Sequence, residues 1–186
     1  GKVAAIDASA LEAGTAYAAV DTHRLDDFSP HLYRTRDFGA SWDAISAGLP
    51  PGRFTPVLRA APVRKGLLYA GTDAGVFVSF DDGARWQPLQ LNLPTAWVGD
   101  LAVHGSDLVA ATQGRALWVL DDVSPLRQIA AGAAQAPAGL FAPAEAIRVR
   151  ANENRDTPLP PEFPIAMNPP AGAVIDYFLR AAPAGP

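Results

Sequence analysis

Short apolar runs recur along the first two thirds of this 186-residue chain. They lie at residues 3–6, 67–71, 76–80 and 108–112. A strand with one solvent-exposed face alternates apolar and polar residues, whereas these runs lack clean alternation, so we expect both of their faces to be covered. The pattern predicts an all-β fold in which short strands are packed in layers.

Two stretches share the pattern Ser/Thr-x-Asp-x-Gly-x-x-Trp: TRDFGASW at residues 35–42 and SFDDGARW at residues 79–86. We expect a structural role for it. Glycine supplies the positive φ of a tight turn, the hydroxyl and carboxylate accept turn N–H groups, and a buried indole pins the hairpin to a neighbouring sheet. The residues concerned are Thr35, Asp37, Gly39, Trp42, Ser79, Asp81, Gly83 and Trp86.

A third, degenerate copy follows. Leu108 and Asp121 repeat Leu68 and Asp81 at an offset of 40 residues, but Val119, Val123 and Leu126 replace the motif's serine, glycine and tryptophan. A period near 40 residues is typical of propeller blades. We therefore predict a partial β-propeller of three four-stranded antiparallel blades, over residues 1–52, 53–94 and 95–130.

The two intact motifs resemble the Asp-box, or BNR repeat, of sialidases, sortilin-type propellers, xyloglucanase-like glycoside hydrolases and photosystem-assembly-factor-like propellers. Residues 66–94 and 114–128 are similar to the last blades of large bacterial glycosyl-hydrolase-like or sortilin-like BNR proteins. Residues 168–179 are similar to the start of the sandwich-like module that follows those blades. The resemblance implies an extracytoplasmic or secreted parent protein whose remaining blades are partners of this chain.

The chain changes character after its third repeat. Residues 131–170 are predicted to form a connector, and six prolines between positions 157 and 170 favour extended chain over a central strand. Residues 171–186 are predicted to be the first strand of a truncated β-sandwich-like module. Since three blades cannot close a ring, we expect both chain ends to continue in a longer polypeptide.

Composition excludes several functions. A formal net charge of −4 provides no basic footprint for nucleic acid. No apolar run reaches the roughly 18 residues of a membrane span. The absence of cysteine excludes disulfides and thiolate metal sites. His23 and His31 lack a paired-ligand spacing, so we predict no metal site and no cofactor.

Candidate binding residues lie in the loops between second and third strands, at the blade end opposite the motif turns, where propellers generally bind ligands. We expect His23, Asp73 and Arg115 to converge there. The alternative is that they are ordinary solvated loop residues with no binding role. The ligand is expected to be a carbohydrate or a protein. The candidates are Asp21, His23, Arg24, Asp26, Asp27, Asp73, Gln113 and Arg115.

The predicted function is binding and scaffolding. The alternative is a share of a glycoside hydrolase active site, contributed by residues 21–30 with Asp73 and Arg115. Neighbouring acids such as Asp81 and Asp82 point to opposite faces of a strand, so neither these nor the other acidic pairs are a catalytic pair, and no catalytic residue is identified.

An incomplete ring also predicts an uncovered face on the first blade. We expect Val3, Ile6, Tyr17 and Tyr33 to expose apolar surface there and to promote self-association, unless the tail after residue 130 folds back over a face.

Overall fold

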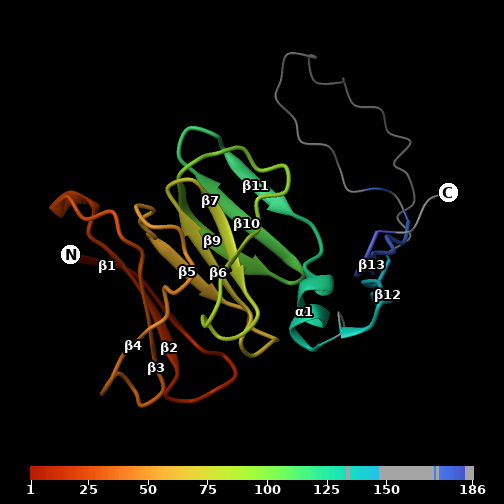
Figure 1. Cartoon of the computed structure of the whole chain (residues 1–186), viewed down its shortest axis with the longest axis horizontal. Helices are drawn as coiled ribbons and strands as arrows, with labels where there is room; N and C mark the ends of the chain where they lie inside the picture. The colour runs from red at the N-terminus through yellow and green to blue at the C-terminus, as the bar shows by residue number, and fades with distance from the viewer. Residues whose placement is uncertain (133–134, 147–169, 171, 183–186) are drawn as a thin grey trace, which may run out of the picture.

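The computed structural model describes residues 1–132, 135–146, 170 and 172–182 (Figure 1). Within them the chain is nearly all β, which confirms the predicted fold class. Three antiparallel sheets follow one another in chain order, and a small fourth sheet lies beside helix α1.

The first two blades have four strands each, in sequential order. Their registers match, since Ala16 pairs with Thr35 in the first blade as Leu68 pairs with Ser79 in the second. The fourth strands are only two residues long. The first blade consists of β1 (Lys2–Ala8), β2 (Ala16–Asp21), β3 (His31–Thr35) and β4 (Asp43–Ala44), and the second of β5 (Val57–Ala60), β6 (Leu68–Thr72), β7 (Gly75–Ser79) and β8 (Gln87–Pro88).

The third blade has three strands, β9 (Val98–His104), β10 (Asp107–Thr112) and β11 (Leu117–Leu120), so the predicted fourth strand is wrong. Helix α1 (Ser124–Ala130) follows instead. Pro125 lies in its first turn, where a missing N–H costs nothing. Val123, which replaces the motif's glycine, is buried, and Leu126 packs against the same core.

Neighbouring blades pack face to face along their inner strands, with β1 beside β5 and β5 beside β9. One core lies between the first and second blades and contains Leu32, Leu58 and Trp86. The other lies between the second and third blades around Tyr69 and Leu101. The middle blade is therefore covered on both sides, as the apolar runs predicted.

The outer face of the first blade is partly apolar. Val3 and Ile6 are 55% and 63% exposed, as expected. The prediction for Tyr17 is wrong, because its side chain is only 3% exposed and its hydroxyl donates to Asp82 Oδ1 of the second blade at 2.6 Å. Tyr33 is half-buried.

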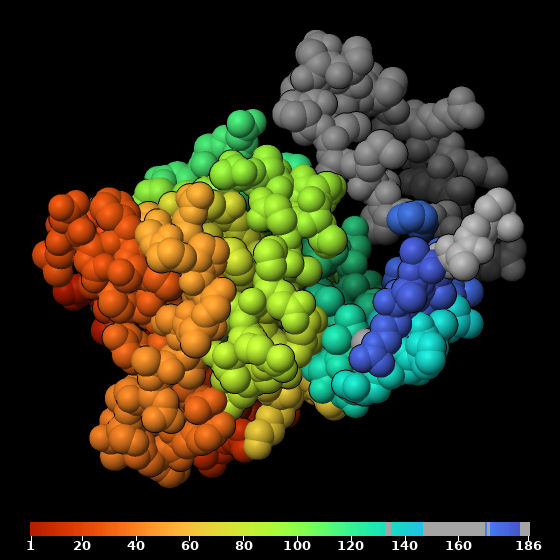
Figure 2. All heavy atoms as spheres, viewed as in Figure 1, coloured from red at the N-terminus to blue at the C-terminus, as the bar shows by residue number. Residues whose placement is uncertain are grey.

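The C-terminal residues form a small antiparallel sheet of β12 (Ala138–Leu140) and β13 (Tyr177–Leu179). The strand expected within residues 171–186 thus has a partner in this chain, and Phe178 packs on Phe141 with ring centroids 5.4 Å apart. Figure 2 shows this sheet, in cyan and blue, beside the third blade. Most of the proline-rich connector lies outside the described residues, and the domain boundaries remain a prediction.

Candidate binding groove

The loops between second and third strands gather at one end of the blades, opposite the motif turns. At that end the inner strands β5 and β9 begin, and the loops attach to the residues just before them. The N–H of Asp73 donates to the carbonyl of Phe54 at 3.3 Å, and the N–H of Gln113 donates to that of Trp97 at 2.8 Å. The first blade's loop contains the short 3₁₀ helix η1 (His23–Leu25).

A groove of about 510 Å³ opens between this first loop and the inner strands. Pockets of about 300–1,000 Å³ are the usual size for small-ligand sites. Its lining comes from all three blades: Gly1, Lys2, Ala4, Asp21, His23, Arg24, Leu25, Pro56, Trp97 and Gly99.

Two aromatic rings, His23 and Trp97, line the groove, and the buried Phe54 packs behind them. The imidazole of His23 stacks on Phe54, with centroids 4.7 Å apart and an interplanar angle of 27°. Trp97 meets both rings edge-on, at 5.8 Å from His23 and 5.2 Å from Phe54. Sequence reasoning missed Phe54 and Trp97. The available signal was their position, since each precedes an inner strand that starts at the ligand end.

Asp21 fixes the orientation of His23. Its Oδ1 lies 2.5 Å from His23 Nδ1 and also accepts the His23 backbone N–H at 3.0 Å. Burial alone would raise the pKa of Asp21, but these two hydrogen bonds outweigh burial and hold its pKa below the ordinary value. Asp21 is therefore ionised near neutral pH and acts as a hydrogen-bond acceptor rather than as an acid.

Asp26 and Asp27 shape the loop and do not line the groove. Asp26 ends η1 in the left-handed conformation, with φ of 62°. Asp27 accepts the N–H of Ser29 at 2.9 Å and lies 2.7 Å from His31 Nε2. The bond from the Ser29 N–H, followed by that from His31, holds the pKa of Asp27 well below its usual range.

The candidates of the second and third blades share this end but do not reach the groove. Asp73 Oδ2 pairs with Arg53 at 3.2 Å. Gln113 and Arg115 are exposed at their loop, where the Arg115 carbonyl accepts the indole N–H of Trp118 at 2.8 Å. Of the eight predicted residues, the groove brings together Asp21, His23 and Arg24.

The motif turns at the other end form the same hydrogen bonds twice. In the first, Asp37 Oδ1 accepts the Ser41 N–H and the Thr35 hydroxyl, both at 2.8 Å, and Thr35 Oγ1 accepts the Gly39 N–H at 2.9 Å. A further bond from the Ser41 hydroxyl is the largest cause that lowers the pKa of Asp37 to about 2.

In the second turn, Asp81 Oδ1 accepts the Arg85 N–H at 2.8 Å and the Ser79 hydroxyl at 3.0 Å. Ser79 Oγ accepts the Gly83 N–H at 2.9 Å. Burial opposes ionisation of Asp81, but the bonds from Arg85 outweigh it and hold the pKa of this carboxylate below its ordinary value. Both carboxylates are occupied by their own turns.

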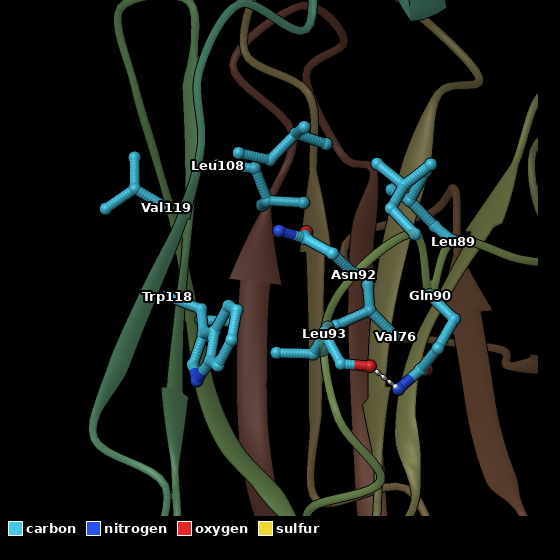
Figure 3. Close-up of a pocket in the computed structure, with 11 residues that line it drawn as sticks. Val76, Leu89, Gln90, Asn92, Leu93, Leu108, Trp118 and Val119 are labelled. Atoms are coloured by element: carbon cyan, nitrogen blue, oxygen red, sulfur yellow. Dashed lines mark hydrogen bonds between the residues drawn. The ribbon is translucent and has the colours of Figure 1, made fainter. Parts of the chain in front are cut away.

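An apolar crevice of about 50 Å³ lies between the second and third blades (Figure 3). Val76 and Leu89 face Leu108 and Trp118 across it. It is far below the about 300 Å³ of ordinary ligand pockets. The groove beside η1 is therefore a better candidate than this crevice, because it has the size of ordinary ligand pockets and holds three of the predicted residues. Within the described residues, no group of three His, Cys, Asp or Glu side chains could hold a metal ion, and no helix is long and apolar enough to cross a membrane.

No model of a known protein family matches the chain, and no curated protein matches it in sequence. Solved structures with a similar fold include a GH74 enzyme of Niastella koreensis, with TM-score 0.50 and 16% identity over 64% of this chain and 21% of that one. An ancestral GH74 enzyme matches with TM-score 0.51 and 17% identity over 62% of this chain and 14% of that one.

The GH74 xyloglucanase of Xanthomonas campestris aligns with TM-score 0.47 and 16% identity, over 64% of this chain and 22% of that one. This chain therefore spans 14–22% of the length of these structures. At such identities the likeness to the first two shows the fold alone: a segment of a β-propeller.

Proposed function

We propose that this chain is a binding and scaffolding segment of a larger β-propeller protein, and that the groove beside η1 binds a saccharide. The lining rings of His23 and Trp97, supported from behind by Phe54, carry this proposal. Sugar rings offer apolar C–H faces between hydroxyl groups, and aromatic side chains cover such faces while nearby polar groups fix orientation. In the groove, polar groups stand beside rings in this way.

The exposed apolar face of the first blade favours the proposal that this chain is part of a larger propeller. Val3, Ile6, Phe38 and Trp42 are all substantially exposed on it. The equivalent face of the second blade is covered by the first. We infer that the two hairpins are Asp-boxes, that further blades of the parent cover this face, and that the parent acts outside the cytoplasm, as the motif resemblance implies.

The groove favours binding over hydrolysis. Glycoside hydrolysis needs two carboxylates about 5–9.5 Å apart, one of them with a raised pKa. Among the described lining residues Asp21 is the one carboxylate, and its pKa is lowered. A hydrolase built on this groove needs a second carboxylate from elsewhere in the parent, so hydrolysis remains the alternative and binding the proposal.

Calorimetric titration with cellotetraose, galactotriose and trigalacturonate tests the proposal. At least one should bind, and Trp97→Ala should weaken that binding about tenfold or more because a stacking surface is lost. Trp97→Phe keeps the packing if the alanine variant unfolds. Trp42→Ala, at the opposite end, is the matched control. No binding by any of the three saccharides, or unchanged binding by folded Trp97 variants, contradicts the proposal.

A further inference from the structure

Two cationic side chains line the groove, and neither forms a direct ion pair there. Lys2, at the start of β1, and Arg24, in η1, are both exposed and both lie on its wall. Neither forms an ion pair within the described parts of the chain, where most other arginines do. Two cationic side chains against the single carboxylate of Asp21 leave the described lining with a positive surplus that can meet an anion.

The groove's one carboxylate offsets part of this charge, because Asp21 is the cross-strand partner of Lys2 and Arg24 helps to lower its pKa. Asp21 lies against His23, which supplies two hydrogen bonds to one of its oxygens. Asp100 of β9 follows the lining residue Gly99 in sequence, and its carboxylate is already paired with Arg59 at 2.7 Å. The chain as a whole carries a formal charge of −4, so a cationic groove is a local feature and not a reflection of overall composition.

We propose that the groove selects an acidic saccharide, one that carries a carboxylate on its sugar ring. This inference rests on the proposed function and deepens it by naming the ligand class. Lys2 and Arg24 attract the carboxylate, while His23 and Trp97 cover the apolar face of the same sugar. Charge complementarity of this kind provides selectivity between ligands of equal size more than raw affinity.

The terminal amino group needs a control. Gly1 also lines the groove, so a free α-amino group there adds a positive charge to any measurement. The test therefore uses the chain with an acetylated N-terminus, in which only Lys2 and Arg24 distinguish an acidic from a neutral ligand.

The experiment compares trigalacturonate with galactotriose by calorimetry. Trigalacturonate should bind about tenfold more tightly, as two exposed charge contacts allow. The preference should shrink when salt is raised from about 0.05 to 0.5 M, since ions screen exposed charges. Equal affinities for both saccharides overturn this inference and leave the proposed function standing. No binding of either also overturns this inference, and the proposed function fails with it only if cellotetraose does not bind either.

Variants locate the preference. The double variant Lys2→Gln with Arg24→Gln should lose it, and its melting temperature should not change because both side chains are exposed. Arg115→Gln, an exposed arginine in an equivalent loop outside the groove, is the matched control and should keep it. A double variant that retains the preference contradicts the assignment.

Discussion

The first and second blades share one turn motif but differ in what their tryptophans do. Trp86 of the second blade is 6% exposed, and its indole N–H donates to the carbonyl of Ile45 in the first blade at 2.7 Å. Trp42, at the equivalent position of the first blade, is 41% exposed. The expectation of a buried indole therefore holds for Trp86 and is wrong for Trp42.

The difference separates what is local from what is tertiary. Eight residues suffice for the hydrogen-bonded corner, because every bond from the carboxylate and hydroxyl stays within the turn. Burial of the indole depends on a neighbouring sheet. Within the described residues, the second blade has such a neighbour on its motif side and the first has none. The motif thus specifies a hairpin and a docking surface, and it does not itself constitute a ligand site.

Removing each tryptophan measures this contrast. Trp86→Ala should lower the free energy of unfolding by about 3–5 kcal/mol, since it opens a cavity in the core between two blades. Trp42→Ala should cost about 1 kcal/mol or less, because its side chain is largely in solvent. Urea denaturation of both variants provides the comparison. Equal losses contradict the assigned difference in burial.

The residue before the motif glycine contrasts in the same way. Asp82 accepts bonds from Tyr17, Arg34 and Arg36 of the first blade at 2.6–2.9 Å. Phe38 holds the equivalent place and is 86% exposed. Asp82→Ala should cost about 2–3 kcal/mol by leaving partly buried donors unpaired, while Phe38→Ala should be close to neutral. Thermal unfolding of the two variants distinguishes these outcomes.

The two motif glycines differ in how much space an added methyl group would have. Gly39 and Gly83 have φ of 88° and 86°, so alanine is strained at both. A Cβ at Gly83 would lie 2.8 Å from Ile45 Cβ, whereas at Gly39 nothing lies closer than 3.9 Å. Gly83→Ala should therefore lose about 1–3 kcal/mol more than Gly39→Ala. If urea denaturation shows equal losses for the two variants, Ile45 moves to accommodate the added methyl group and the prediction is wrong.

The exposed carboxylate of the first motif gives the smallest effect. The folded-state pKa of Asp37 is about 2, below its ordinary 3.8, mainly because of bonds from Ser41. Its contribution to stability is present above pH 3.8 and is lost as pH falls toward 2. A carboxyl NMR titration of Asp37 should show a midpoint near 2, and a midpoint near 3.8 means that the turn does not hold the ionised form.

Local chemistry explains which features the sequence could predict. The two motif turns could be predicted because their residues contact one another within a few positions, and the three-unit repeat because the pattern recurs along the chain. Helix α1 was missed because the third repeat suggested another strand, although Pro125 in a first-turn position was a helix-start signal. Phe54 and Trp97 were missed because they contact His23 only after three blades come together, and no motif marks either of them.

The four tryptophans of the chain report on the binding proposal together. Trp42 lies on the first blade's open face, Trp86 at an interface, Trp97 in the groove and Trp118 in the apolar crevice. Trigalacturonate should shift the indole N–H signal of Trp97 in a ¹H–¹⁵N NMR spectrum and leave the other three in place. Movement of Trp42 or Trp118 with Trp97 unchanged, or no movement at saturating ligand, contradicts a saccharide site in this groove.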